Sequence, residues 1–589
     1  MISFLLTFFI IFPYFSFRDN LSTSKYITFA TSIAFSYACL GFLGMLIVFL
    51  KLTYIPIFFV LSLIFIYLLT KKSYRENLYS LYFQLKKEII YVAHLGRYEK
   101  TLKIFFFILI LLFLVSFGPI NHSDTANVYV GYPYQFWKNN SHFIDGNLNQ
   151  GLMGIGDFAN IFYFQEKTTW LIRSSQFIPV PLIFMLMLRK KIKNLYLFTF
   201  LTSPVFVQWL TIGKNNFLSE SCLALAFLAW EENRDKKYIP NIIVLSLIAI
   251  SFKISAILVV TPIVFFLIYF YRKYITINLI KDFLKLISLP IILGFTFLIT
   301  IFCYRYFLIG NPLYPLFSKI FNPYDLQLID WEETLRTWER SGFFPLWIFI
   351  PKSLGRIAFV LGPANLLIFI YGIILYFRLS ISKNATILVG ISQFILLIFF
   401  SQGRADYYMT PLILICAGFP EKYLSNFDLN LFRFKLSFLK KQIFSLVIFI
   451  QLIMFLISCF YSIGLVFYVL YDYEAGMNKT AYNFYNSRKI EKFAESPVLS
   501  EITGMTHLYS NKPFIANQKF QRCFFYEKNM SDNQKYKYCM KKEDIKTIIT
   551  KKDKLKSNPF LTCESNNLIR ASRNIFLEEK LSVDFCKLK

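Results

Sequence analysis

The sequence predicts an all-α polytopic membrane protein with about fourteen transmembrane helices and a small extracytoplasmic α/β domain at its C-terminal end. Three observations predict this fold class. The 589 residues are 56% hydrophobic and 20% aromatic, and their mean hydropathy is +0.49. Only 17% of them are charged. The 70 phenylalanines lie in long apolar runs that a soluble core of this size could not bury.

Fourteen apolar runs follow one another, and most can cross a hydrocarbon layer of about 30 Å at about 1.5 Å per helical residue. They cover residues 2–17, 27–50, 54–70, 104–120, 170–188, 195–213, 216–230, 239–252, 254–271, 284–309, 352–377, 385–401, 405–419 and 442–470. The stretch 239–271 is too long for one helix and carries Lys253 near its middle, so we expect two short helices and a polar break. Broken helices persist at membrane depth only beside a cavity, and the break therefore indicates a site.

The cations behind the net charge of +28 are unevenly distributed between the loops, and this distribution indicates how the chain is oriented in the membrane. Eight cations lie in 71–103 and five in 420–441, whereas the opposite loops are longer and hold fewer. Because cytoplasmic loops retain Lys and Arg, we expect both termini and the loops 121–169 and 310–351 outside the cytoplasm. Without a long basic arm, this charge does not indicate a nucleic-acid partner.

Segment 71–103 mixes its cations with aromatic residues. That pattern fits a helix lying on the anionic cytoplasmic leaflet, in contact with membrane lipids. A solvated connector is the other interpretation, and composition leaves both open.

The tail, residues 471–589, is polar and rich in lysine, with short apolar bursts that suggest a small α/β domain. Five of the nine cysteines lie in membrane segments, and the other four are in this tail: Cys523, Cys539, Cys563 and Cys586. An even set in an extracytoplasmic domain favours two disulfides over free thiols, with three pairings open. Wide spacings and a single nearby histidine, His507, argue against zinc.

Motifs of the commoner hydrolases are missing. The chain has four histidines and contains no HExxH, CxxC, P-loop or GxSxG sequence. This argues against the usual metal-hydrolase, nucleotide-hydrolysing and serine-hydrolase mechanisms. No metal ligands and no certain cofactor emerge, although the acidic external loop leaves room for a divalent cation.

The first external loop carries a carboxylate close to a membrane helix. Asp124 follows the run 104–120 directly, and aromatic residues crowd the segment after it, among them Tyr129, Tyr132 and Trp137. A carboxylate beside aromatic platforms suits sugar chemistry, because it can take a proton from a hydroxyl while flat apolar faces hold pyranose rings. The alternative is a helix cap within an aromatic belt.

Further candidates lie in later segments. The second external loop reads GNPLYP from Gly310, a rigid turn that would bring Tyr314 to the interface. Arg404 begins the last external turn, and Arg173 and Lys253 are cations inside apolar runs. Cations facing a cavity suit a phosphate group. They can also be explained by side chains reaching toward the nearer interface.

In this order, these elements resemble the GT-C superfamily of membrane glycosyltransferases, which includes protein O-mannosyltransferases and the bacterial aminoarabinose–lipid A transferase. The likeness runs through residues 104–420. It rests on the following residues and motifs: Asp124, Asp157, Thr202-Ser-Pro, Ser251-Phe-Lys-Ile-Ser-Ala, Gly310-Asn-Pro-Leu-Tyr-Pro and Arg404-Ala-Asp-Tyr-Tyr-Met-Thr-Pro. Where such proteins often carry an acidic residue at the turn near 214, this chain has Lys214 and two asparagines.

The resemblance implies transfer of a sugar from a polyprenyl-phosphate carrier to a glycan, lipid or protein acceptor outside a bacterial inner membrane. Asp124 would be the catalytic base and Asp157 a second acidic residue. Lys253 and Arg404 would bind the donor phosphate, and Tyr129, Tyr132, Trp137 and Tyr314 would contact substrate.

The resemblance also suggests a division of the chain. Residues 1–103 would hold N-terminal helices and a basic cytoplasmic segment, 104–420 the catalytic core, 421–470 a cytoplasmic loop and last membrane helix, and 471–589 the tail. A polysaccharide polymerase or a lipid-linked oligosaccharide flippase shares these features and is the alternative function. A third class is a structural or signalling protein whose tail binds an extracellular partner.

Overall fold

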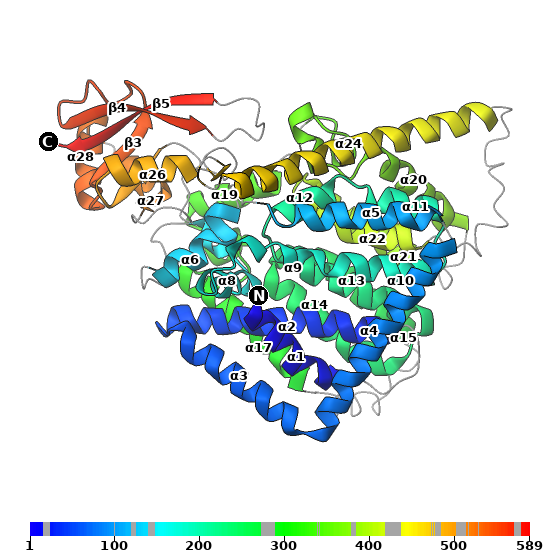
Figure 1. Cartoon of the computed structure of the whole chain (residues 1–589). Coiled ribbons are helices and arrows are strands. Elements are labelled where there is room, and N and C mark those ends of the chain that lie inside the picture. The colour runs from blue at the N-terminus through cyan, green and yellow to red at the C-terminus, as the bar shows by residue number, and fades with distance from the viewer. Residues whose placement is uncertain are drawn as a thin grey trace.

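The computed structural model describes residues 1–15, 24–98, 100–118, 125–138, 148–271, 289–337, 340, 342–378, 385–418, 437–472, 474, 476–477, 484–501, 514–515, 517–527, 529–570 and 579–589. A bundle of helices forms the larger part, and the tail builds a sheet-containing domain at one end of it (Figure 1). All fourteen apolar runs contain helical structure within these ranges.

The N-terminal helices wrap one side of the bundle. They are α1 (Ile2–Phe15), α2 (Ser24–Phe49), α3 (Tyr54–Thr70), α4 (Lys72–Tyr98) and α5 (Lys100–Val115). Helices α3 and α4 meet at a bend of 95°. On α4 the side chains of Tyr79, Tyr82 and Phe83 are exposed, whereas Glu88 is buried in ion pairs with Lys25 and Arg189. The described part of segment 71–103 is thus largely helical and exposes these three aromatic side chains, and its position at the membrane surface stays a prediction.

The middle of the chain consists of short helices around one central helix. In chain order they are η1 (Thr125–Tyr129), α6 (Gly131–Lys138), η2 (Leu148–Leu152), α7 (Ile155–Phe158), α8 (Asn160–Gln165), η3 (Thr169–Leu171), α9 (Ser174–Phe177), α10 (Pro179–Arg189), α11 (Asn194–Leu201), α12 (Val205–Thr211), α13 (Asn216–Asn233), η4 (Lys236–Tyr238), α14 (Ile239–Phe252), η5 (Ile254–Ala256) and α15 (Ile257–Tyr271). Every residue of α13 from Asn216 to Trp230 is buried. A helix that is apolar on all sides belongs in the centre of a bundle, and α13 packs against α2, α10, α14 and α22.

The remaining helices complete the bundle. They are α17 (Leu289–Ile309), α18 (Ser318–Phe321), α19 (Leu326–Thr337), η7 (Leu346–Ile348), η8 (Leu354–Phe359), α20 (Pro363–Arg378), α21 (Ala385–Phe400), η10 (Ala405–Tyr408), α22 (Met409–Ala417) and α24 (Ser437–Tyr471).

By length and composition, six helices among the described residues could cross a membrane, or seven if the bent pair α3–α4 counts as one span. Four more apolar helices are shorter. Two of the other expected spans are shortened for visible reasons: Thr202 and Ser203 separate α11 from α12, and α14 stops at Phe252. The expected break at Lys253 is therefore present, with the backbone of this residue extended between α14 and η5.

The tail is the expected α/β domain. Its five-stranded sheet has the order β2–β1–β3–β5–β4, in which β1 (Val498–Ser500) is parallel to β2 (Phe514–Ile515) and β3 (Thr547–Lys551). The pairs β3–β5 and β4–β5 are antiparallel, with β4 at Leu561–Arg570 and β5 at Glu579–Leu588. Side chains alternate across the sheet, so Ile548 faces α27 (Asn517–Tyr526) and α28 (Asp532–Lys542) while Ile549 packs with α26 (Phe484–Phe493).

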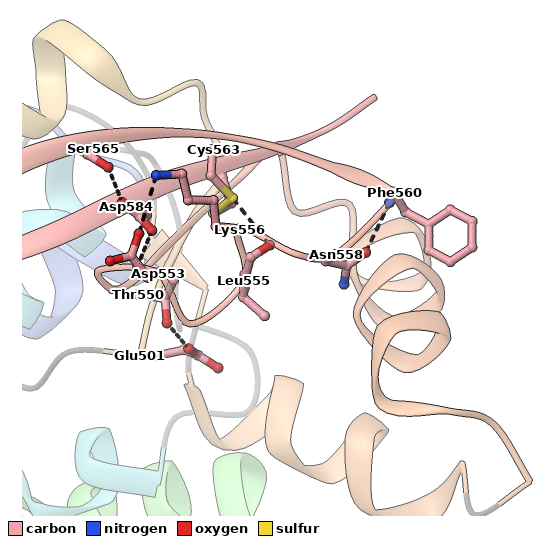
Figure 2. Close-up of a disulfide and its surroundings, with 11 residues drawn as sticks. Glu501, Thr550, Asp553, Leu555, Lys556, Asn558, Phe560, Cys563, Ser565 and Asp584 are labelled. Atoms are coloured by element: carbon pink, nitrogen blue, oxygen red, sulfur yellow. Dashed lines mark hydrogen bonds and ion pairs between the residues drawn. A yellow bond between two sulfur atoms is a disulfide. The ribbon is translucent and has the colours of Figure 1, made fainter.

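Two disulfides stabilise the tail, as expected, and the pairing is sequential: Cys523 with Cys539, and Cys563 with Cys586. Cys563 lies directly opposite Cys586 in the β4–β5 ladder. Figure 2 shows Asp584 near this disulfide, where one carboxylate oxygen accepts from the Ser565 hydroxyl at 2.7 Å and the other from the backbone N–H of Asp553 at 2.6 Å. These bonds join the hairpin to the turn after β3.

Figure 1 places α6, α8 and α19 at the end of the bundle that carries the tail, and α4 toward the opposite end. In intact cells, a membrane-impermeant thiol reagent should therefore label a Lys589→Cys variant and leave Lys72→Cys unlabelled, with the parent chain as background. Both positions are exposed, so accessibility on the two sides is matched. Equal labelling of the two variants would contradict the orientation derived from the charge asymmetry.

Candidate active site

Helix α7 carries Asp157 and is wedged between α2 and α14. A Cβ atom added at Gly41 or Gly44 of α2 would lie 2.1 or 2.2 Å from a carbonyl oxygen of α7. One added at Gly154, just before α7, would lie 1.8 Å from the carbonyl oxygen of Phe252 at the end of α14. Because no side chain fits at these distances, the three glycines set how deeply α7 sits between the two helices.

The Asp157 carboxyl group is buried and held by two donors. The backbone N–H of Gly154 donates to Oδ2 at 2.9 Å, and Asn215 Nδ2 donates to Oδ1 at 3.3 Å. Asn215 is itself fixed, since its Nδ2 also donates to the Gly156 carbonyl at 2.8 Å and its Oδ1 accepts from Gln176 Nε2 at 2.8 Å. A chain of side-chain amides thus positions this carboxyl group.

Burial raises the pKa of Asp157 to about 7. The N–H of Gly154, the ammonium of Lys253, the amide of Asn215 and the ammonium of Lys214 oppose this shift without cancelling it. Near neutral pH, the Asp157 carboxyl group is consequently present in both its neutral and its charged form.

Lys253 lies at the break between α14 and α15, and its ammonium rests on aromatic rings. It is 4.6 Å from the centre of the Tyr407 ring and 5.7 Å from that of Tyr129. The ammonium of Lys214 is 5.1 Å from the same Tyr129 ring. Since ring faces attract cations within about 6 Å, the Tyr129 ring attracts two ammonium groups that come from separate segments.

Asp406 supplies negative charge to this cluster of cations. It is 2% exposed, with Arg404 Nε 3.1 Å from its Oδ1 and Lys214 Nζ 3.7 Å from its Oδ2. An ion pair this deeply buried is stable only with close partners on both sides, because desolvating each charge costs several kcal/mol. The segment that begins at Arg404 is therefore joined to the segment that begins at Lys214.

Glu220 is a third buried acidic residue, after Asp157 and Asp406. From the central helix α13, its carboxyl group accepts from Asn216 Nδ2 at 3.3 Å and from the Thr410 hydroxyl at 3.4 Å. Lys253 and Asp406 are both near enough to interact with it electrostatically. Together with Asp157, Lys214, Lys253, Arg404 and Asp406, Glu220 forms what we call the charged cluster.

Asp124 lies outside the described residues, and the described residues on either side of its segment contact segments that carry cations. On one side, Thr125 is buried and its hydroxyl accepts from the backbone N–H of Gly213, next to Lys214, at 3.2 Å. On the other side, a Cβ at Gly118 would lie 3.1 Å from the guanidinium of Arg173.

The structure brings four of the predicted site residues into one neighbourhood: Asp157, Lys253, Arg404 and Tyr129. The contacts of the other three belong to adjoining aromatic packing. Tyr132 stacks on Phe136 with ring centres 6.1 Å apart, and Trp137 packs on Tyr134 at 6.0 Å. Tyr314 is fully buried, with its ring against Gly151. Whether these three contact substrate stays a prediction.

Sequence reasoning missed Glu220 and Asp406 as site residues and treated Lys214 only as a departure from the family pattern. A signal was present, because Glu220 is a single carboxylate inside an apolar run. In the part of the chain that the structure covers, no group of three or more His, Cys, Asp or Glu side chains has the arrangement of a metal site.

No family model matches this sequence, and neither does any curated protein. Among solved structures, the chain is similar to ArnT from Cupriavidus metallidurans bound to undecaprenyl phosphate, with 11% identity, a TM-score of 0.46, and 82% of this chain and 97% of that one covered. It is also similar to apo ArnT from the same organism, with 11% identity, a TM-score of 0.41 and coverages of 84% and 98%. At this identity and these TM-scores, the similarity says nothing about chemistry.

An Asp157→Asn variant tests the burial of this carboxyl group. The pKa of Asp157 is raised from its ordinary 3.8 to about 7, so the folded protein binds more protons than the unfolded chain between about pH 4 and 7. Stability then falls as pH rises through that window, and the asparagine variant should lose this part of the pH dependence. Thermal unfolding in detergent from pH 4.5 to 7.5 measures it. Parallel curves for the two proteins would show that the carboxyl group keeps its ordinary pKa.

Proposed function

We propose that this chain is a membrane glycosyltransferase that moves a sugar from a polyprenyl-phosphate donor to a cell-envelope glycan, lipid or protein acceptor on the extracytoplasmic face of a bacterial inner membrane. One observation carries the proposal. Two ammonium groups and one guanidinium, those of Lys214, Lys253 and Arg404, gather at a helix break beside Tyr129 and Asp406. Such a group of cations suits a phosphate.

The partners of these cations support phosphate binding. The ring faces of Tyr407 and Tyr129 attract the ammonium group of Lys253, and we infer that they position it for an incoming phosphate. The raised pKa of Asp157 acts in the same direction, since its neutral form adds no negative charge near the phosphate.

The proposed reaction assigns the proton and the leaving group. The acceptor hydroxyl oxygen attacks C1 of the sugar while Asp124 takes its proton. As the new C1–O bond forms, the bond between C1 and the phosphate oxygen breaks, and the lipid phosphate leaves with the electron pair. Lys253 and Arg404 offset the developing charge. Attack opposite the leaving group inverts the configuration at C1.

The base is tested by Asp124→Asn. This variant should insert and accumulate normally but give no glycan product, because an amide cannot take the acceptor proton. Analysis of cell-envelope glycans in a strain that carries only the variant provides the measurement. Product at the normal level would remove the catalytic role of Asp124. Movement of labelled lipid-linked sugar across vesicles by the purified parent chain, without transfer, would favour a flippase instead.

The phosphate site is tested by Lys253→Met, with Lys190→Met as the matched control. Lys190 is a partly buried lysine, 11% exposed, whose ammonium pairs with Glu231 at 3.2 Å outside the charged cluster. Loss of a cation that stabilises the leaving phosphate should lower kcat/KM for the lipid-linked donor by about 100-fold or more. Lys190→Met should retain activity and Lys253→Arg should recover part of it. Similar losses for both methionine variants would point to a general effect of removing a lysine.

A further inference from the structure

A cleft of about 530 Å³ lies where the tail meets the external loops of the bundle. Helices α27 and α28 of the tail line one side, and η2, the end of α17 and the start of α19 line the other. Its volume falls within the range of about 300–1,000 Å³ that is typical of small-molecule sites.

The tail side of this cleft is rigid. The Cys523–Cys539 disulfide joins α27 to α28, and the ion pair between Lys519 and Glu543, at 2.8 Å, joins the same two helices. Since Cys523, Lys519 and Glu543 all line the cleft, the bonds that hold the helices together also fix the shape of this wall.

One ion pair links the two sides. Arg522 Nη2 lies 3.0 Å from Asp325 Oδ2, so a residue of α27 contacts the residue just before α19. Asp325 is held from its own side as well, because its Oδ1 accepts the backbone N–H of Leu328 at 3.2 Å. The cleft is therefore formed before any ligand enters it.

The lining matches the two surfaces of a sugar. Leu308, Ile309 and Leu328 supply an apolar part, which suits the C–H face of a pyranose ring. The amides of Gln150 and Gln327, with the charged pairs, offer both donors and acceptors to hydroxyl groups. Tyr526, 66% exposed, adds an aromatic face.

The charges of the lining favour an uncharged, hydroxyl-rich ligand. Three cations, Lys519, Arg522 and Lys542, face two carboxylates, Asp325 and Glu543. A strongly anionic ligand would meet both carboxylates, whereas vicinal hydroxyls can donate to a carboxylate and accept from its cationic partner at once. This balance distinguishes the cleft from the charged cluster.

A short buried segment connects the cleft to the charged cluster. Gln150 lines the cleft, and the next residue, Gly151, accepts from Arg305 Nε through its carbonyl at 3.0 Å. Arg305, fully buried on α17, also donates to the Met153 carbonyl at 3.0 Å. The segment pinned in this way leads directly to Asp157.

We propose that the cleft is an oligosaccharide-binding site, which holds uncharged sugar units of a glycan acceptor a short distance from the reaction site. That the bound glycan is an acceptor rests on the proposed function, whereas the binding of sugar in the cleft does not. An oligosaccharide site in this cleft makes the tail a domain that selects the substrate. Among the acceptor classes, it favours a glycan over a lipid or a protein.

Binding is measured with the purified full chain in lipid nanodiscs, without donor, on an array of immobilised neutral oligosaccharides of three to six units. Acidic oligosaccharides and peptides are immobilised on the same array and tested separately. Neutral sugars should be retained, and Tyr526→Ala and Arg522→Gln should each weaken this retention about tenfold. This is the loss expected for one aromatic contact in the first variant and for one charged hydrogen bond in the second. Arg488→Gln is the matched control: Arg488 has the same 52% exposure as Arg522 and also forms an ion pair, with Glu474, but it does not line the cleft.

No retention of neutral sugars, retention in the acidic or peptide arms alone, or an equal loss in Arg488→Gln would overturn the proposal. Tyr526→Ala keeps the test valid if Arg522→Gln disturbs the fold, because removing an exposed ring leaves the ion pair between the tail and the bundle in place. Lys253→Met should still bind sugar. A chain that binds sugar but transfers none would refute only the proposed function. Unchanged acceptor KM in active Tyr526→Ala and Arg522→Gln variants would refute only the cleft.

Discussion

A charge buried in an apolar bundle is stable only if the protein supplies partners for it, and this requirement organises the centre of the molecule. Asp406 is placed between Lys214 and Arg404, and Glu220 is placed near Lys253. The contacts of Asp406 with Lys214 and of Glu220 with Lys253 each join segments that are separated in sequence. These segments must therefore come together for the chain to fold. When they do, their charged side chains form a polar site inside the helical bundle.

The helix breaks follow from the same requirement. An interrupted helix exposes backbone groups that lipid cannot satisfy, so a break must face protein or a cavity. At the break after α14, the backbone N–H of Lys253 still donates to the Ala249 carbonyl, and its side chain reaches the rings of Tyr407 and Tyr129. The break therefore costs little backbone bonding while turning a long cationic side chain toward the site.

Much of this could be predicted from the sequence, because apolar runs and isolated charges are local signals. The runs, the break at Lys253, the α/β tail and the presence of two disulfides were all predictable in this way. The pairing of Cys563 with Cys586 was not, since it depends on the register of β4 against β5. Glu220 and Asp406 were missed because their importance comes from neighbours contributed by other segments. Lys214 was read against a family pattern, whereas in the structure its acidic partner is Asp406, which comes from a distant segment.

The seating of α7 against Gly41 and Gly44 has a consequence for the three N-terminal helices, which lie outside the family resemblance. A shortened chain that began at residue 104 would retain every motif of that resemblance. It would nevertheless lose the surface of α2 on which the carbonyl oxygens of α7 rest. Helix α2 therefore supports the charged cluster, and a methyl group at either glycine would displace a carboxyl group carried by a different part of the chain.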